Sequence, residues 1–502
     1  MLINASRSRD ILECIASLSS DEVATPPAVA NQVLDLLPVE VWSNKDLRWL
    51  DPACKTGVFL REAARRLMEG LKDSIPDETE RRKHIFTNML HGYALTELTA
   101  QMSRRSLYYN KDASDKKLSV VQFRRSEGNI VHQQLDHQYR ESGTCERCSA
   151  AKKDFDRPGN LERHAYDFIH MEEVEVEKMR FDVVVGNPPY QLNNGESSAF
   201  PIYQYFVEQA FKLRPRYVAM IIPSRWFAGG KGLDEFRGRM LASRNFKTLV
   251  DFPDAEDVFA GVEIKGGVCY FLWDSGHNGP CEFISMLEGQ ESSRSVRFLN
   301  QHDGVFIRFN EALPLVERIK REESAFMAPL VSSQTPFGLI TSFSDFADGP
   351  GKGRVKVYTR GSETKWVERR QISRHQEWLD AWKVLVPVGS GSGSAAADVI
   401  LGNMIVAGPG TACTQTYLVI GPFESEQIAE SVRSYLRTKV VRFLIAILKN
   451  TQHVRASLLS YVPVVDWGKE WNDDMLINRW NITATELAFI HSRVLPYKGD
   501  SE

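Results

Sequence analysis

The stretch FDVVVGNPPYQ, from Phe181 to Gln191, decides the fold class. Its run of β-branched residues, Val183–Val185, is typical of a buried β-strand. The strand stops at a glycine, an asparagine and two prolines. Because proline fixes φ and has no backbone N–H, the turn offers hydrogen-bond acceptors in a stiff frame.

Strand-like and helical runs alternate around this stretch, from about residue 20 to residue 275. We expect strands at residues 47–54, 89–95, 181–186, 216–223 and 266–273, and helices at residues 58–71 and 202–213. Such alternation predicts a doubly wound α/β sheet. Ligands of such sheets bind beyond the carboxyl ends of the strands.

The chain of 502 residues is long for one hydrophobic core, so we expect two domains, at residues 1–300 and 301–502. Hydrophobic content of 43% and charged content of 25% are typical of a soluble protein. The apolar runs are too short to cross a membrane, and the N-terminus lacks the apolar core of a secretory signal. Seven scattered cysteines favour reduced thiols, and we expect a cytoplasmic protein without a membrane partner.

Asn187 is the candidate catalytic residue. At the end of a parallel strand it would project its side-chain carbonyl into the crevice, and Tyr190 adds a flat apolar face. Two acceptors beside a ring suit a planar heterocycle with an exocyclic NH₂, since the acceptors hold the amine hydrogens while the ring stacks on the base.

Asn-Pro-Pro-Tyr at residues 187–190 resembles motif IV of S-adenosylmethionine-dependent amino methyltransferases, in particular the DNA adenine-N6 class. Four further stretches resemble parts of that family: DPACKTGVFL at residues 51–60 is similar to motif I, TPP at residues 25–27 to motif X, EGNIV at residues 127–131 to motif III, and residues 206–226 followed by GGVCYFLW at residues 266–273 to the later strands and motif VIII. The order X, I, IV and then a C-terminal region is that of the gamma class from restriction–modification systems.

The resemblance implies a Rossmann-like methyltransferase sheet followed by a C-terminal α+β target-recognition domain. It implies S-adenosylmethionine as cofactor, double-stranded DNA as partner, and methyl transfer to the N6 of a flipped adenine, and it leaves open a separate restriction endonuclease. The resemblance assigns catalysis to Asn187, Pro188, Pro189 and Tyr190. It assigns cofactor contacts to Thr25, Pro26, Asp51, Pro52, Ala53, Lys55, Gly57, Phe59, Glu97 and Asn129.

Two positions depart from the family pattern. Lys55 replaces the first glycine of motif I, so its ammonium either pairs with the cofactor carboxylate or weakens cofactor binding. The usual place of the ribose-binding acid is Ala94. Glu97, three residues later, either reaches the ribose or is a solvated charge at a helix N-terminus.

Other functions remain open at this point. Lys55 is also compatible with a catalytically silent DNA-recognition subunit, and Asn-Pro-Pro-Tyr also serves methyltransferases that act on RNA or on protein glutamine. PDAEDVFAGVEIK at residues 253–265 matches a Pro-Asp…Glu-x-Lys nuclease signature. Because so short a pattern occurs by chance, we do not predict a nuclease.

The segment from His132 to His170 is an unusual insert that contains a Cys-x-x-Cys pair. Cys145 and Cys148, with two histidines from among His137, His164 and His170, would make a tetrahedral structural zinc site, and we expect His137 or His164 as a partner first. The alternative is a pair of surface thiols in a charged loop.

A basic patch lies in the C-terminal region. Between residues 352 and 374, eight Lys/Arg stand against two Glu, a net charge of +6 in a chain whose net charge is −3. Such a patch is either a solvated face or a phosphate-binding surface. The candidate DNA-binding residues in it are Lys352, Arg354, Arg369 and Arg370.

Overall fold

The computed structural model describes residues 24–133, 135–152, 165–172, 179–192, 200–262, 264–300, 306–389, 398–449 and 453–497. The chain divides into two compact units, Met1–Gly304 and Val305–Glu502. Within the described ranges, no helix is both long and apolar enough to cross a membrane.

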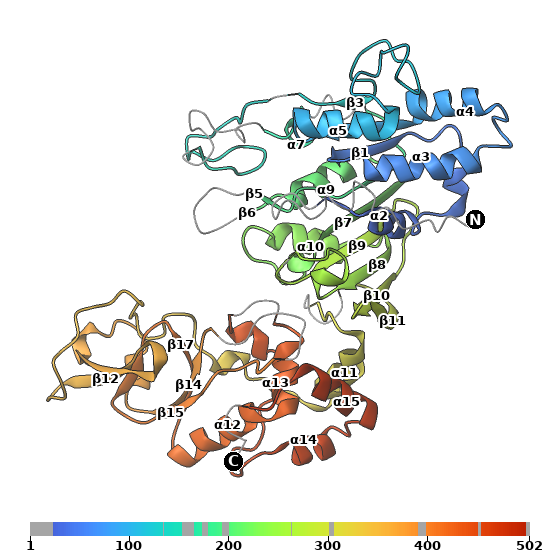
Figure 1. Ribbon diagram of the computed structural model, residues 1–502. Coiled ribbons are helices and arrows are strands. Elements are labelled where there is room, and N and C mark those ends of the chain that lie inside the picture. Colours follow the sequence, from blue (N-terminus) through green and yellow to red (C-terminus); the bar gives the residue numbers. More distant parts are fainter. Residues whose placement is uncertain are drawn as a thin grey trace, which may run out of the picture. The chain divides into compact units, whose positions relative to one another are not determined.

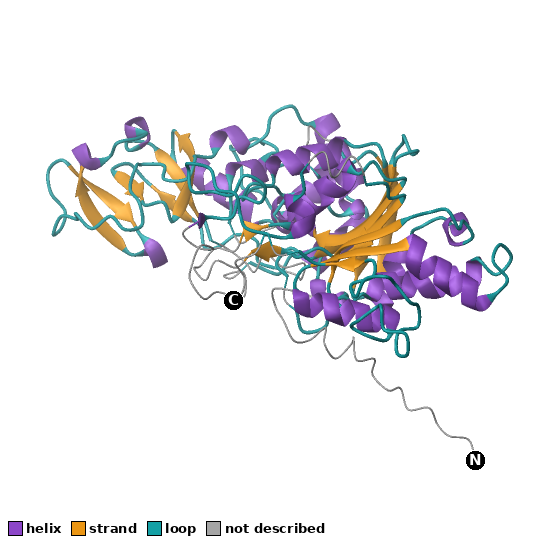
Figure 2. Ribbon diagram, turned by 90° about the horizontal axis from the view of Figure 1, so that it is seen from above, coloured by secondary structure: helices purple, strands orange, loops and turns teal. Residues whose placement is uncertain are grey.

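A mixed sheet forms the centre of the first unit (Figures 1 and 2). Among the described residues it has nine strands, in the order β11-β10-β8-β9-β7-β4-β1-β2-β3. The strands are β1 (Trp49–Cys54), β2 (Leu90–Ala94), β3 (Ile130–Val131), β4 (Val183–Gly186), β7 (Tyr217–Pro223), β8 (Phe246–Phe252), β9 (Val268–Asp274), β10 (Cys281–Leu287) and β11 (Gln290–Arg297).

Strand direction divides this sheet into two parts. Strands β3, β2, β1, β4 and β7 run parallel to one another, whereas β9 is antiparallel to both β7 and β8, and β11 is antiparallel to β10. The α/β class expected from the alternation is therefore confirmed. A short second pair joins β5 (Gln191–Leu192) to β6 (Phe200–Pro201) directly after the Asn-Pro-Pro-Tyr turn.

The helices of the first unit connect and cover these strands. They are α2 (Pro27–Leu34), α3 (Val58–Gly70), α4 (Glu78–His84), α5 (Glu97–Tyr108), α7 (Asp167–His170), α9 (Tyr203–Lys212) and α10 (Asp234–Ala242). Helix α3 contacts α2, α5 and β1, while α9 contacts α7 and β7. The buried face of α3, with Phe59, Leu60, Ala63 and Leu67, packs into the core of the sheet, as its 3.6-residue periodicity predicts.

The described residues of the second unit form two small sheets and a group of helices. Its strands are β12 (Arg354–Tyr358), β13 (Thr364–Glu368), β14 (Trp382–Pro387), β15 (Ile405–Ala407), β16 (Thr411–Cys413) and β17 (Tyr417–Phe423). Its helices are α11 (Leu313–Glu322), α12 (Glu426–Arg437), α13 (Lys439–Ala446), α14 (Asp473–Arg479) and α15 (Ala484–Arg493). Strands β13-β12-β16 form one sheet and β15-β14-β17 the other, and α12 packs on β14 and β17.

Candidate functional site

The carboxyl ends of three neighbouring strands bring the predicted motifs together. β1 lies between β2 and β4 and is parallel to both, with Trp49 opposite Leu90 on one side and Val183 on the other. Asp51, Ala94 and Asn187 therefore lie at one edge of the sheet, which is where a parallel α/β sheet binds its ligands.

Asp51 is the buried acid of this edge. Its Oδ1 accepts a hydrogen bond from the backbone N–H of Ala53 at 3.0 Å. Burial raises the pKa of Asp51 to about 7, although the nearby ammonium of Lys55 acts in the opposite direction. A Cβ on Gly186 would lie 2.8 Å from Asp51 Oδ1, so the carboxylate packs directly against the residue that precedes Asn187.

Asn187 is joined to the segment that resembles motif X. Its Nδ2 donates a hydrogen bond to Oγ1 of Thr25 at 3.0 Å, and the two residues are only 3% and 4% exposed. Thr25 directly precedes Pro26, the N-cap of α2, so the start of that helix holds the side chain that fixes the Asn187 amide.

The other residues of the turn are also buried. Pro188 and Pro189 are buried, and Tyr190 packs edge-on to Phe259 with ring centroids 6.5 Å apart. Burial raises the pKa of the Tyr190 hydroxyl well above its usual value, so the phenol stays neutral. All four residues of the turn, from 187 to 190, are therefore shielded from solvent.

The motif I segment forms the end of β1 and the start of α3. Gly57 is the N-cap of α3 with φ of +75°, and a Cβ there would lie 3.1 Å from Ser103 Cα, so close helix packing requires glycine. Lys55 is 8% exposed, and its backbone carbonyl accepts a hydrogen bond from Ser103 Oγ at 3.3 Å. Phe59 is buried in the apolar core. Pro52 and Ala53 are buried within β1.

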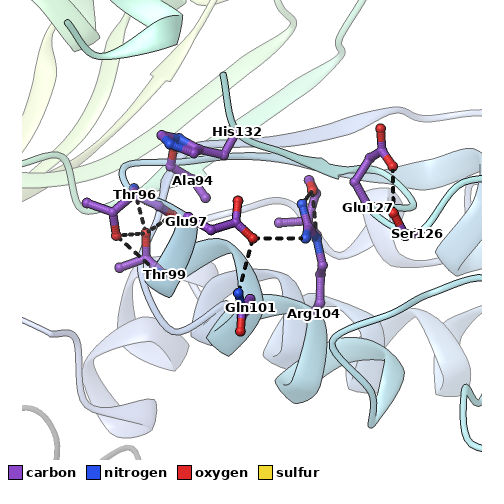
Figure 3. Close-up of polar contacts among 10 residues, drawn as sticks. Ala94, Thr96, Glu97, Thr99, Gln101, Arg104, Ser126, Glu127 and His132 are labelled. Carbon is purple, nitrogen blue, oxygen red and sulfur yellow. Dashed lines mark hydrogen bonds and ion pairs between the residues drawn. The ribbon is translucent and has the colours of Figure 1, made fainter. Parts of the chain in front are cut away.

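Glu97 lies in the first turn of α5, next to the carboxyl end of β2. Figure 3 shows its carboxylate directed toward Arg104 and Gln101, at 3.8 Å and 3.2 Å respectively. The side chain is 61% exposed and lines a cavity of about 900 Å³, together with Arg104, His132 and other residues. Glu97 is therefore a solvated charge in the first turn of a helix and also lines a cavity, while its contact with a ribose stays a prediction.

Asn129 lies at the amino ends of the strands, opposite to the carboxyl ends that carry Asn187. It directly precedes β3, and its Nδ2 donates to the backbone carbonyls of Phe86, Thr87 and Leu90 at 3.0–3.1 Å. These carbonyls precede or begin β2, so Asn129 connects the amino ends of two strands. The structure does not bring it to the other predicted cofactor residues.

Sequence reasoning did not predict three residues that line the cavity or contact its strands. The Arg104 guanidinium donates to Ile130 O at 2.9 and 3.1 Å, which fixes β3 against α5. His132 Nδ1 lies 3.1 Å from Ala94 O. Burial raises the pKa of Asp167 to about 6, and this carboxylate accepts from Gln133 N at 2.6 Å. No short motif marks these residues, because tertiary contacts alone assemble them.

The cysteine pair of the insert is assembled with two histidines. His137, Cys145, Cys148 and His170 have ligand atoms that all lie within 4.8 Å of one another. The predicted ligand His137 belongs to this cluster, and the second histidine in it is His170, on α7; His164 lies outside the described residues.

The four candidate DNA-binding cations differ in whether they pair with an acid. Arg354 pairs with Glu368 at 2.9 Å, and Arg369 pairs with Asp380 through two hydrogen bonds of 3.0 and 2.5 Å. Lys352 and Arg370 are exposed. In the nuclease-like stretch, Asp254 caps a short helix by accepting from Glu256 N, and Glu263 lies outside the described residues.

Two sequence comparisons place the chain among known proteins. Residues 88–259 match the family of Eco57I restriction-modification methylases. An uncharacterized adenine-specific methylase of Mycoplasma pneumoniae is 40% identical over 299 residues, which cover 54% of this chain and 71% of the relative.

Solved structures of restriction–modification proteins are also similar to this chain. The type IIL enzyme MmeI, solved in complex with DNA, is 10% identical with a TM-score of 0.48, over 87% of this chain and 67% of MmeI. A type I methyltransferase subunit from Streptococcus thermophilus is 15% identical with a TM-score of 0.34, over 56% of this chain and about half (52%) of the subunit. A chain of a type I system likewise matches over about half of its length (53%) with a TM-score of 0.37. Because these TM-scores lie below 0.5, the family assignment rests on the sequence matches.

Proposed function

Because the chain belongs to the adenine-specific DNA methylases of restriction–modification type, we propose that it moves a methyl group from S-adenosylmethionine to the exocyclic N6 of a flipped adenine in duplex DNA. In this proposal the unit Met1–Gly304 is a Rossmann-like methyltransferase domain. The unit Val305–Glu502 is an α+β target-recognition domain, and a separate restriction endonuclease can act with the protein.

The observation that carries the proposal is the convergence of three segments on Asn187. Thr25 binds its amide, and Gly186 beside it packs against the buried carboxylate of Asp51. A strand end used only for packing has no need of a buried acid and a fixed amide from two distant segments. Together they support one site that holds a cofactor next to a base.

The residues around Asp51 fit S-adenosylmethionine in charge and hydrogen-bonding character. Burial removes the solvation of the Asp51 carboxylate and raises its pKa to about 7. A cationic neighbour would replace the lost solvation and so stabilise the ionised form. Lys55 suits the cofactor carboxylate, and Glu97 suits ribose hydroxyls from the carboxyl end of β2. When bound, this cofactor supplies an electrophilic methyl group.

Asn187 and Pro188 would hold the adenine amine. The Asn187 side-chain carbonyl and the Pro188 backbone carbonyl accept its two hydrogens and so direct the nitrogen lone pair toward the methyl group. These hydrogen bonds strengthen as positive charge develops on nitrogen, which stabilises the transition state more than the bound base. The Tyr190 ring would stack on the base.

Adenine N6 lies inside the duplex, so the base must leave the stack at a cost of a few kcal/mol. Phosphate contacts of the protein offset this cost. We assign such contacts first to Lys352 and Arg370, which are exposed, and only second to Arg354 and Arg369, which already pair with acids.

The test is methyl transfer from tritiated S-adenosylmethionine to four acceptors: duplex DNA, single-stranded DNA, RNA and a glutamine-containing peptide. Digestion of the labelled DNA should give N6-methyldeoxyadenosine as the labelled nucleoside. Label in RNA or peptide alone would overturn the choice of substrate. Calorimetry with S-adenosylmethionine tests the silent-subunit alternative, which predicts no binding at high micromolar cofactor.

Asn187→Ala separates binding from chemistry in the same assay. The variant should bind S-adenosylmethionine as the parent protein does and transfer no methyl group, because the acceptor that holds the amine is gone. Retained transfer would rule out the role proposed for Asn187.

A further inference from the structure

Two cysteines and two histidines of the segment from residue 132 to residue 170 form a compact cluster. Cys145 and Cys148 are 1% and 0% exposed, and His137 and His170 are partly buried beside them. Cys145 Sγ lies 3.5 Å from His170 Nε2, and Cys148 Sγ lies 3.4 Å from His137 Nδ1. A ring nitrogen therefore lies close to each sulfur.

These separations match the edges of a tetrahedral zinc site. Zinc binds thiolate sulfur at about 2.3 Å and imidazole nitrogen at about 2.0–2.1 Å, so the sulfur–nitrogen edges of a tetrahedron measure roughly 3.6 Å. The two observed distances are within about 0.2 Å of that value. All four ligand atoms also lie within 4.8 Å of one another, so one ion can reach them all.

The surrounding hydrogen bonds orient the ligands. His170 Nδ1 lies 2.8 Å from the carbonyl oxygen of Tyr166, which can only accept a hydrogen bond, so Nδ1 carries the proton. In this tautomer Nε2, which faces Cys145, has a free lone pair for a metal ion. In the cysteine turn, Cys145 N donates to Ala150 O at 2.8 Å and Ser149 N donates to Cys145 O at 3.1 Å. The backbone thus closes a turn that directs both sulfurs to the same side.

The described residues from 135 to 152 bury little apolar surface. Among them, the buried ones are Cys145, Cys148 and Ala150. Their other described links to neighbouring elements include polar contacts, such as Ser149 Oγ to Tyr205 Oη at 2.9 Å and Arg147 to Glu172 at 3.6 Å. A segment that buries so little apolar surface needs another constraint to hold one conformation.

We propose that His137, Cys145, Cys148 and His170 bind one structural zinc ion. The donor set of two thiolates and two imidazoles in a tetrahedral arrangement is one that zinc prefers. The ion fastens the turn that carries Cys145 and Cys148 to α7, and protein ligands fill all four positions, so it takes no part in methyl transfer. His137 and His170 also line the cavity of about 900 Å³, so the ion stiffens one of its walls.

Metal analysis of the full-length protein, purified under reducing conditions without a histidine tag, tests the proposal. We expect about one zinc per chain. Exchange for cobalt(II) should give the visible d–d bands of a tetrahedral site and near-ultraviolet bands of thiolate–cobalt charge transfer. Metal-free protein that takes up no zinc from buffer would overturn the proposal, as would an octahedral cobalt spectrum.

Variants identify the ligands. Cys145→Ser and His170→Ala should lose most of the bound zinc and the thiolate–cobalt bands, or, where folding fails, be rescued by excess zinc. Cys281→Ser, at a buried cysteine on β10, and His491→Ala, at an exposed histidine on α15, should keep the metal. Equal loss in the control variants, or a Cys145–Cys148 disulfide in the reduced protein, would contradict the assignment.

Discussion

The side-chain amide of Asn187 donates a hydrogen bond to the hydroxyl of Thr25, 162 positions earlier in the chain, at 3.0 Å. Because Nδ2 is committed to Thr25, the orientation of the amide is fixed, and Oδ1 is the end that can accept the amine of a base. Thr25 is therefore a positioning residue for Asn187 in the proposed reaction.

Thr25→Val keeps the shape of the side chain and removes the hydroxyl. Without it the Asn187 amide can rotate, and its buried N–H loses an acceptor. We expect kcat to fall roughly 10-fold, equivalent to about 1.4 kcal/mol, with KM for S-adenosylmethionine little changed. Steady-state kinetics of methyl transfer to duplex DNA measures both parameters.

Thr25→Ser is the matched control, because it keeps the hydroxyl and should retain most of kcat. If the valine variant had unchanged kcat, or if the serine variant lost as much, the hydroxyl would have no positioning role. Calorimetry with S-adenosylmethionine shows in each variant whether the cofactor still binds.

Much of the first unit was predictable because its strands and helices carry strong local patterns. The valines of β4 and the apolar periodicity of α3 locate these elements to within a few residues. Strand β8 and the hairpin of β10 and β11 were not predicted: β11, with the sequence QESSRSVR, is mostly polar and partly exposed. The antiparallel direction of β9 was not predictable either, because it depends on pairing with β7 and β8 and no pattern within the β9 sequence indicates it.

The candidate site was predictable only where residues lie close together in the sequence. Asn187 and Asp51 belong to short motifs, whereas the contact of Asp51 with Gly186 joins distant segments. The sequence could not choose two histidines among His137, His164 and His170, because histidine spacing in a long insert does not determine which rings turn toward the cysteines. Asn129 was assigned by resemblance to a motif, yet its hydrogen bonds join the amino ends of the strands.

Gly186→Ala tests the contact between β4 and Asp51. The new Cβ would lie 2.8 Å from Asp51 Oδ1, so either the strand or the acid must shift. We expect the free energy of unfolding to fall by about 1–3 kcal/mol, the usual cost of an overpacked core position. Thermal and urea unfolding of the two proteins give this difference.

Gly238→Ala is the control for the same chemical change. Gly238 lies within α10, and a Cβ there meets no atom within 4 Å, so alanine should stabilise the helix by up to about 1 kcal/mol. Equal effects of the two substitutions would show that Gly186 has no steric role.

Asp51→Asn tests the raised pKa of the buried acid. The pKa of Asp51 is about 7 in the folded protein and about 4 in the unfolded chain, so the folded state binds the proton more tightly. This preference stabilises the folded state fully below about pH 4, and the stabilisation is lost as the pH rises from 4 through 7. The asparagine variant stays neutral and lacks this loss. Between pH 4 and pH 7 the cofactor-free parent protein should therefore lose stability relative to the variant, by on the order of a few kcal/mol.

Urea unfolding of both proteins at several pH values from 4 to 8 measures this difference. Asp46→Asn, at an exposed aspartate with 80% of its side chain accessible, provides the comparison. If the difference between the parent protein and Asp51→Asn did not change with pH, Asp51 would not hold its proton in the folded state.

The basic patch of the second unit separates into two groups that should behave differently. Lys352→Glu and Arg370→Glu reverse exposed charges, so each should weaken DNA binding and reduce the slope of log K against log[salt] by about 0.9 per lost phosphate contact. Arg354→Gln and Arg369→Gln remove partners of Glu368 and Asp380, so they should change the slope less.

Arg321→Glu, an exposed charge reversal on α11, is the control for net charge alone. Filter binding of duplex DNA from 50 to 200 mM salt measures the slopes. An Arg321→Glu slope that falls as far as those of Lys352→Glu and Arg370→Glu would mean that net charge, and not this surface, governs the affinity.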